Sequence, residues 1–358
     1  MLKRKTGTAV RASRTHNYVE QKSVGNLDRR SFLMASGLGA AAMMAPITAA
    51  GRVQAAPADT PALSPEIKHV KTICQFCSVG CSIWAEVENG AWIGQEPVFE
   101  SPINQGTHCC KGAAMREISK GERRLKYPMK KVAGEWKRIS WDQAISEISQ
   151  KLGTIRTDYG PDSAYWLGSA KFSNEQAYLF RKFAAYWGTN NVDHQARICH
   201  STTVAGVSNI YGYGAMTNTF NDIRNSKSMI IIGGNPAEAH PVSMLHVLNA
   251  KENGSKLIVV DPRFTRTAAH ADEYVRIRPG SDIGFLMGLV REILANGWEA
   301  KEYIDQRVWG IEEIRTEAEN WTPEEVERVS GIPADQTRKV ARMLAENRPG
   351  TLVWCMGL

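Results

Sequence analysis

The sequence lacks the charge excess that its overall composition suggests. The 358 residues carry a net charge of +7, but nine of the 44 Lys/Arg and only two of the 37 Asp/Glu lie in residues 1–55. The rest of the chain therefore holds 35 basic and 35 acidic side chains. A balanced chain offers no broad electrostatic patch for DNA, RNA or an anionic membrane. We therefore expect no nucleic acid among its partners.

A long run of Leu, Ile and Val is also missing near the N-terminus. A twin arginine at residues 29–30 precedes an Ala/Gly-rich stretch that contains Pro46 and ends in VQA at residues 53–55. A membrane anchor is the alternative, but it needs about 20 predominantly apolar residues, whereas this pattern is typical of an export signal. The leader resembles twin-arginine signals, which carry folded proteins out of the cytoplasm. We expect residues 1–55 to be removed, residues 56–69 to be a linker, and the mature chain to be periplasmic without a span of its own.

Two nucleotide-binding motifs are absent. No G-x-G-x-x-G follows an apolar strand, and no G-x-x-x-x-G-K-[ST] occurs in the chain. These absences disfavour a NAD site and a P-loop phosphate site.

The cysteines near residue 75 lack the second C-x2-C pair that zinc sites commonly have. Their frame is C-x2-C-x3-C-x27-C, formed by Cys74, Cys77, Cys81 and Cys109, with Cys110 directly after it. Three thiolates within eight residues can converge on one cubane if the loop curls tightly, which Gly80 favours. The spacing predicts a [4Fe-4S] cluster. Zinc is the main alternative and, for an exported chain, a disulfide is the second.

After residue 123 the apolar pattern predicts alternating helices and strands. Ser140 is expected to cap a helix whose apolar residues repeat from Trp141 to Ile155 and cover a core. A short strand in SAYWLGS and a helix that ends at Gly188 follow. SMIIIGG and KLIVV read as buried strands on either side of a helix in PVSMLHVLNAKENG, as in a parallel sheet. The predicted fold class is α/β, with a small N-terminal iron–sulfur domain followed by Rossmann-like parallel-sheet domains.

Ligands of parallel sheets bind outside the carboxyl ends of the strands. These ends are GGNPAEAH and DPRFTR. Glycines there let a backbone approach a phosphate, arginines can pair with its oxygens, and an aspartate can accept from a ribose or guanine. The residues concerned are Gly233, Gly234, Asp261, Arg263 and Arg266. A plain α/β core with surface loops would show the same pattern, so the ligand stays open at this point.

CQFCSVGC with a later C-x-K-G resembles the cluster domain of the molybdopterin oxidoreductase superfamily, whose members include formate dehydrogenases and nitrate reductases. The resemblance makes Cys109 the fourth cluster ligand, places Cys110 where the family commonly has Pro, and makes Lys111 the lysine between cluster and pterin. It also implies that the sheet-edge loops hold a bis-molybdopterin guanine dinucleotide carrying Mo or W. The implied cofactor contacts are Gly234, Asn235, Glu238, His240, Asp261, Arg263, Thr265, Gly280 and Asp282, with Asn174 and Glu175 as weaker candidates.

Cys199 and His200 are the pair of residues that separates a formate dehydrogenase from a nitrate reductase within this superfamily. A lone cysteine is most often a small buried apolar residue. A thiolate can nevertheless ligate Mo or W, a neighbouring imidazole can take a proton, and Arg197 would favour the thiolate. ARICHSTTVAGV, followed by GGNPAEAHP and VVDPRFTRTA, resembles the catalytic subunit of formate dehydrogenases. In that family a metal-bound cysteine or selenocysteine precedes a histidine.

The resemblance implies that formate is oxidised to CO2 at a metal held by Cys199. His200 would assist proton movement, and electrons would pass Lys111 to the cluster, then an iron–sulfur beta subunit and often a membrane cytochrome b. A nitrate or other oxyanion reductase, and a non-catalytic iron–sulfur or zinc module, are the alternatives. The expected domains are 70–125 for the cluster, 126–195 for an incomplete α/β domain and 196–358 for the dinucleotide. Relatives continue further, so we expect an N-terminal fragment with little or no catalysis of its own.

Overall fold

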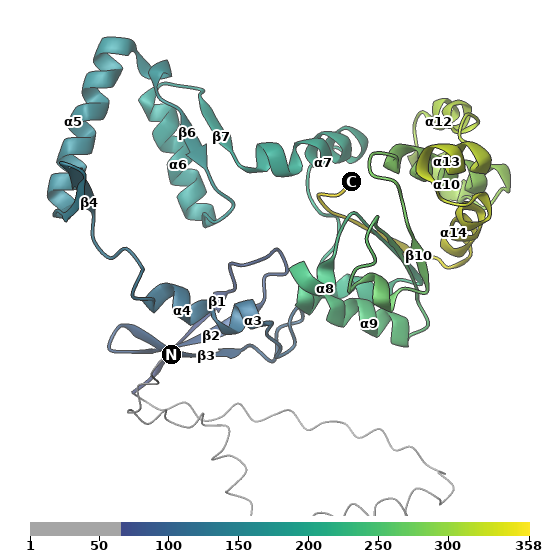
Figure 1. Ribbon diagram of the computed structural model, residues 1–358, viewed down its shortest axis with the longest axis horizontal. Coiled ribbons are helices and arrows are strands. Elements are labelled where there is room, and N and C mark those ends of the chain that lie inside the picture. The colour runs from purple at the N-terminus through teal and green to yellow at the C-terminus, as the bar shows by residue number, and fades with distance from the viewer. Residues whose placement is uncertain (1–65) are drawn as a thin grey trace, which may run out of the picture. The chain divides into compact units, whose positions relative to one another are not determined.

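The structure of the protein is a computed structural model that describes residues 66–358 (Figure 1). The expected signal, residues 1–55, and most of the expected linker lie outside the described residues. The described chain is a mixed α/β structure with a parallel sheet, which confirms the predicted fold class. Within residues 66–358, no helix combines the length and apolarity that a bilayer crossing requires.

The first part is an antiparallel sheet of order β1-β2-β3 with two short helices. Its elements are β1 (Lys68–Ile73), β2 (Ser82–Glu88), β3 (Ala91–Pro97), α3 (Cys110–Ala113) and α4 (Met115–Lys120). Ile73 at the end of β1 pairs with Ser82 at the start of β2. The eight residues between them therefore form a closed loop, which the bond from Cys74 N to Cys81 O, 2.8 Å, ties at its base.

The second part contains a two-stranded hairpin, three helices and a pair of short parallel strands. Its elements are β4 (Met129–Val132), β5 (Glu135–Arg138), α5 (Trp141–Tyr159), η1 (Pro161–Ser163), β6 (Trp166–Gly168), α6 (Asn174–Trp187), β7 (Val192–His194) and α7 (Ala196–Tyr211). Ser140 Oγ accepts from Gln143 N at 3.1 Å, which confirms the predicted cap of α5. α6 ends at Gly188 with φ 98°, as its sequence predicted.

The apolar face of α5 departs from expectation. Its helical spacing was right, but Trp141 is 65% exposed and Ile145 and Ile148 are each 58% exposed. Ala144 is the buried residue of this helix. The residues that the structure describes therefore do not supply the core that this face was expected to cover.

The third part is a four-stranded parallel sheet of order β10-β9-β8-β11 with helices on both faces. Its elements are η2 (Phe220–Asn225), β8 (Ser228–Ile232), α8 (Pro236–Ala239), η3 (Pro241–Ser243), α9 (Met244–Glu252), β9 (Lys256–Val260), η4 (Ala268–His270), β10 (Glu273–Val275), α10 (Asp282–Ala295), α11 (Lys301–Arg307), α12 (Ile311–Ala318), α13 (Pro323–Ser330), α14 (Ala334–Glu346) and β11 (Gly350–Trp354). The helix expected throughout PVSMLHVLNAKENG is instead divided into η3 and α9.

The sheet buries alternate residues of each strand on opposite faces. Ile230 and Ile232 pack with residues of α10, α13 and α14, whereas Met229 and Ile231 pack with residues of α9. The central strands β8 and β9 are buried on both sides, which explains their uninterrupted apolar sequences. Because the strands are parallel, the loops at their carboxyl ends lie along the same edge of the sheet.

Asp272, just before β10, makes the folding stability of this domain depend on pH. Burial alone would raise the pKa of Asp272, but hydrogen bonds from Lys251 Nζ at 2.8 Å and Leu257 N at 2.7 Å outweigh it and lower the pKa. A lowered pKa stabilises the fold above the ordinary aspartate pKa of about 3.9, and this stabilisation is lost as the pH falls through the folded value.

We expect Asp272→Asn to lower the free energy of unfolding by about 1 kcal/mol at pH 7. The difference from wild type should shrink below about pH 4, measured by urea denaturation at several pH values. Asp305→Asn, on the exposed side of α11, is the control and should change stability by less than about 0.5 kcal/mol. If the difference in unfolding free energy between wild type and Asp272→Asn stayed constant down to acid pH, the charge of Asp272 would not contribute to stability.

Candidate functional site

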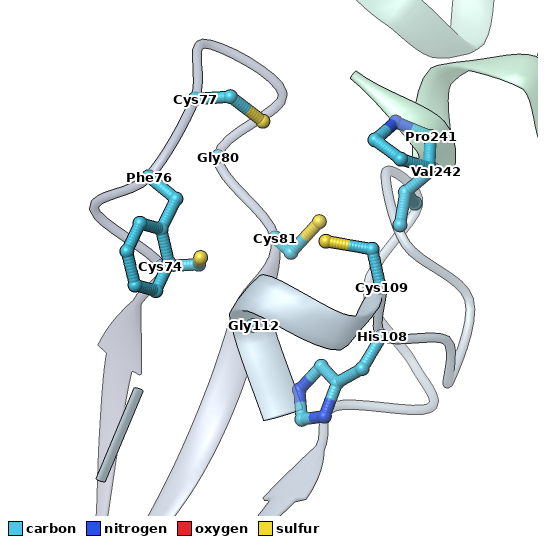
Figure 2. A pocket seen from close by; sticks show the side chains of 10 residues that line it. All are labelled: Cys74, Phe76, Cys77, Gly80, Cys81, His108, Cys109, Gly112, Pro241 and Val242. Carbon is cyan, nitrogen blue, oxygen red and sulfur yellow. The ribbon is translucent and has the colours of Figure 1, made fainter. Parts of the chain in front are cut away.

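Four cysteines from two segments converge on one cavity (Figure 2). Cys74, Cys77 and Cys81 come from the loop between β1 and β2, and Cys109 comes from the residue that precedes α3. The loop curls at Gly80, whose φ is 67°, the left-handed conformation that glycine adopts readily. The other residues that line the cavity are Phe76, Gly80, His108, Gly112, Pro241 and Val242.

Cys110 does not line this cavity. Its side chain is exposed, whereas its neighbour Cys109 is partly buried in the cavity wall. All seven cysteines of the chain lie within the described residues and none forms a disulfide. The geometry thus favours Cys109 over Cys110 as the fourth member of the set.

The cavity is a poor environment for bare thiolates. Burial, together with the neighbouring cysteines Cys74, Cys77 and Cys109, raises the pKa of Cys81 to about 11. Burial also raises the pKa of Cys74. Four negative sulfurs so close together need a positive group among them, as the iron of a cluster provides.

A zinc ion and a four-iron cluster require different arrangements of their ligands. A zinc site needs its ligands about 2.0–2.3 Å from a single ion. In a four-iron cluster each thiolate binds a different iron. Within residues 66–358, no three His, Cys, Asp or Glu side chains are arranged to hold a single metal ion.

The cluster cavity adjoins the loops at the carboxyl edge of the parallel sheet. Lys111 Nζ donates to Ala239 O at 2.9 Å and to Glu238 O at 3.3 Å. Burial and the nearby Lys111 charge both lower the pKa of His240. Lys111 thus links the cluster segment to the segment after β8.

Glycine is required at the carboxyl end of β8. Gly233 has φ 65°, and a Cβ there would lie 2.7 Å from the backbone of Gly357 and Leu358. A Cβ on Gly234 would lie 2.5 Å from Cys355 Sγ. The segments after β8 and β11 therefore pack closely, backbone against backbone at Gly233 and backbone against the Cys355 side chain at Gly234.

We expect Gly233→Ala to destabilise the domain by at least about 1 kcal/mol more than Gly254→Ala. Both glycines have positive φ, but a Cβ on Gly254 would meet nothing within 4 Å. The pair therefore separates the cost of the close approach from backbone strain, which is about 1–2 kcal/mol for each. Thermal or chemical unfolding measures the difference. Equal losses would mean that the two loops do not meet as closely as described.

Several of the predicted cofactor-binding residues form hydrogen bonds with other residues of the protein. Asn235 Oδ1 accepts from Thr267 Oγ1 at 2.7 Å, and Asp261 Oδ1 accepts from Arg263 N at 2.8 Å. Thr265 is only 4% exposed, and its hydroxyl accepts from Ala268 N. Thr265 stays a predicted cofactor contact, and in the structure its side chain is buried and bonded within its own loop.

The remaining predicted residues differ in their positions. Glu238 is exposed and lies 3.6 Å from Arg266 Nε, and Arg263 is exposed. Gly280 precedes α10 with φ 83°, and Asp282 is the first residue of that helix. Asn174 and Glu175 begin α6. Among the described residues, no hydrogen bond or ion pair joins these two to the sheet-edge loops.

Cys199 and His200 lie in the first turns of the 16-residue helix α7. Cys199 Sγ is 3.5 Å from His200 Nε2. Arg197, expected to favour the thiolate, instead pairs with Asp193, whose Oδ2 is 2.9 Å from Arg197 Nε. Bonds from the His194 backbone and from Arg197 lower the pKa of Asp193.

Comparison with known proteins gives a consistent result. Residues 67–121 match the Molybdopterin oxidoreductase Fe4S4 domain, and residues 124–342 match the Molybdopterin oxidoreductase family. The chain belongs to the molybdopterin oxidoreductases. Its two matched domains indicate a [4Fe-4S] cluster and a molybdopterin with Mo or W.

Two curated relatives of this molybdopterin oxidoreductase are formate dehydrogenases. The chain is 37% identical to F420-dependent formate dehydrogenase 1 subunit alpha of Methanococcus maripaludis, over 82% of this chain and 43% of the relative. It is 38% identical to formate dehydrogenase H of Escherichia coli, over 82% of this chain and 42% of the relative. The chain thus spans less than half the length of these two proteins.

One solved structure is also similar to this chain. Acetylene hydratase from Pelobacter acetylenicus has a TM-score of 0.72 and 28% identity, with 80% of this chain and 40% of that chain covered. That enzyme's name shows that similar folds serve different reactions, so the substrate must be argued from the site.

Sequence reasoning missed a titratable residue of the cluster cavity. His108, directly before Cys109, lines the cavity, and burial lowers its pKa. A histidine next to an expected metal ligand was the available signal.

Proposed function

We propose that this chain carries the cluster, the metal-binding cysteine and part of the cofactor site of a formate dehydrogenase catalytic subunit. The observation that carries the proposal is the Cys199–His200 pair at the start of α7, in a chain similar to two formate dehydrogenases. The reaction converts formate to CO2, one proton and two electrons. In this proposal the cofactor is bis-molybdopterin guanine dinucleotide, whose Mo or W supplies the two-electron chemistry.

Each proposed residue has a defined task. Cys199 binds the metal through Sγ, near the N-terminus of α7. His200 Nε2 lies close enough to exchange a proton beside that sulfur. Cys74, Cys77, Cys81 and Cys109 hold the cluster, and Lys111 lies between the cluster and the pterin. The positive charge of Lys111 stabilises added electrons on either side of it.

The sheet-edge loops bind the guanine dinucleotide in this proposal. In this proposal Gly234 contributes backbone groups to the site, and the exposed Arg263 can pair with the phosphate oxygens. Asp261, His240, Glu238, Asn235, Gly280 and Asp282 surround the same edge. Asn235 and Asp261 are already held by bonds within the protein, which fixes their orientation before a ligand arrives.

We also propose export through the twin-arginine route to the periplasm and transfer of electrons to an iron–sulfur beta subunit and a membrane cytochrome b. The twin arginine at residues 29–30 supports export. The names of both relatives support formate as the substrate. They do not support one particular electron acceptor, since the Methanococcus maripaludis relative is named F420-dependent and the Escherichia coli relative is not.

Two assays on one preparation of the full-length protein test the substrate. Formate should reduce benzyl viologen, and nitrate should not oxidise reduced viologen at a comparable rate. The reverse result would assign an oxyanion reductase. Zinc without iron in the same preparation would remove both assignments and leave a structural module.

A further inference from the structure

A hydrogen bond joins the helix that carries Cys199 to the parallel sheet. Trp354 Nε1, at the end of β11, donates to Thr203 Oγ1 of α7 at 3.1 Å. Among the described residues, no other hydrogen bond or ion pair connects residues 196–211 with residues outside 193–212. None of the 16 residues of α7 is fully buried. The orientation of this helix therefore depends on few contacts, and the bond to Trp354 is one of them.

The bond lies on the same face of α7 as Cys199. Residues four apart on an α-helix lie one above the other, about 6 Å apart along the axis, so Thr203 follows Cys199 on this face. Both residues are partly buried, whereas their neighbours Ile198 and His200 are exposed. A rotation of α7 about its axis would therefore move the Thr203 hydroxyl and the Cys199 sulfur in the same direction.

Trp354 is itself held by the sheet and its core. It pairs with Ile232 of β8 and packs against the hydrophobic cluster that includes Phe285. The residue before α7 has a separate contact, because Gln195 Oε1 accepts from Ala170 N at 2.8 Å. This second contact fixes the position of the helix start. The bond from Trp354, more than one turn further along, fixes the rotation of the helix about its axis.

We propose that Trp354 is a positioning residue that sets the direction in which α7 presents Cys199 Sγ to the metal. An indole Nε1–H only donates and a threonine hydroxyl oxygen can accept, so the direction of the bond is defined. Trp354 touches no reacting atom in this role and acts through Thr203. The inference rests on the proposed function, in which Cys199 binds Mo or W. A displacement of about 1 Å at a reacting centre can lower the rate about a hundredfold.

Two substitutions remove the bond from its two ends. Trp354→Phe keeps an aromatic ring in the core but removes the N–H, and Thr203→Val keeps the shape of the side chain but removes the acceptor. In the full-length holoenzyme, we expect each to lower kcat for formate oxidation about tenfold and to change KM by less than about twofold. The double variant should lose no more activity than either single variant, because both remove the same bond. Thr203→Ser keeps the hydroxyl and should keep the activity.

The chain offers a matched control for each change. Trp309→Phe removes an indole N–H from a side chain that is 96% exposed. Thr316→Val removes a hydroxyl whose hydrogen bond, to Glu312 O, stays within α12. Neither control should change kcat or KM. A loss in the controls as large as in the two variants would overturn the proposal, because the loss would not depend on the bond.

The EPR signal of Mo(V) or W(V) gives a readout besides activity. Trp354→Phe and Thr203→Val should shift the g values of this signal alike, because both displace the Cys199 sulfur, and should leave the signal of the reduced cluster unchanged. An unchanged metal signal with wild-type kcat in both variants would overturn the proposal. If Trp354→Phe does not fold, Thr203→Val decides alone. Wild-type protein that does not oxidise formate would instead refute the proposed function, and the metal signals would still decide this inference.

Discussion

Cys199→Ala in the full-length protein should lower formate-dependent reduction of benzyl viologen by about a thousandfold or more, as removal of a residue at the reacting centre does. The variant loses the only side-chain sulfur of α7, and with it the proposed bond to Mo or W. Cluster iron should stay unchanged, because Cys199 is not among the residues that line the cluster cavity. The activity assay and iron analysis on the same sample together measure this separation.

Ser208→Ala, on the same helix, is the control for this variant. It should keep wild-type activity, since Ser208 lies more than two helical turns beyond the Cys199–His200 pair. If Cys199→Ala kept a tenth or more of the activity, the catalytic assignment of Cys199 would be wrong. Loss of iron together with activity would indicate general misfolding instead.

Cys109→Ala should remove most of the cluster iron, whereas Cys110→Ala should retain it. The two residues are adjacent, but only Cys109 lines the cavity and Cys110 is exposed. A cluster that loses one of four thiolates leaves an iron without a protein ligand. Iron content and the EPR signal of the reduced cluster give the answer directly.

The two substitutions remove the same atoms from neighbouring positions, so each is the control for the other. Retention of the cluster in Cys109→Ala together with its loss in Cys110→Ala would reverse the assignment. Retention in both would show that the fourth ligand lies elsewhere. Electron transfer from formate to an external partner should fail whenever the cluster is lost.

Short sequence patterns were sufficient to predict helix ends, buried strands and the cysteine set. Ser140 was predicted as a helix cap and Gly188 as a helix end, and both are observed. The uninterrupted apolar strands β8 and β9 were predicted as members of a parallel sheet because both faces of such a sheet are buried. The cysteine spacing also predicted a set that the structure brings to one cavity.

Features that depend on tertiary contacts were not predictable in this way. Thr265 is buried by packing that its sequence neighbours do not reveal. The pair of Asp193 and Arg197 is by contrast a local i,i+4 contact at the start of α7, and the sequence analysis did not consider it. The apolar face of α5 has the right period but is not covered by the described residues. His108 was missed because its unpaired nitrogen is visible only once the cavity is formed.

The central claim is that the sulfur of Cys199 is bonded to the metal of the active site. X-ray absorption at the Mo or W edge of the full-length protein, compared with Cys199→Ser, tests it most directly. The account predicts that the serine variant loses one metal–sulfur contact and gains one metal–oxygen contact. Identical spectra for the two proteins would contradict it.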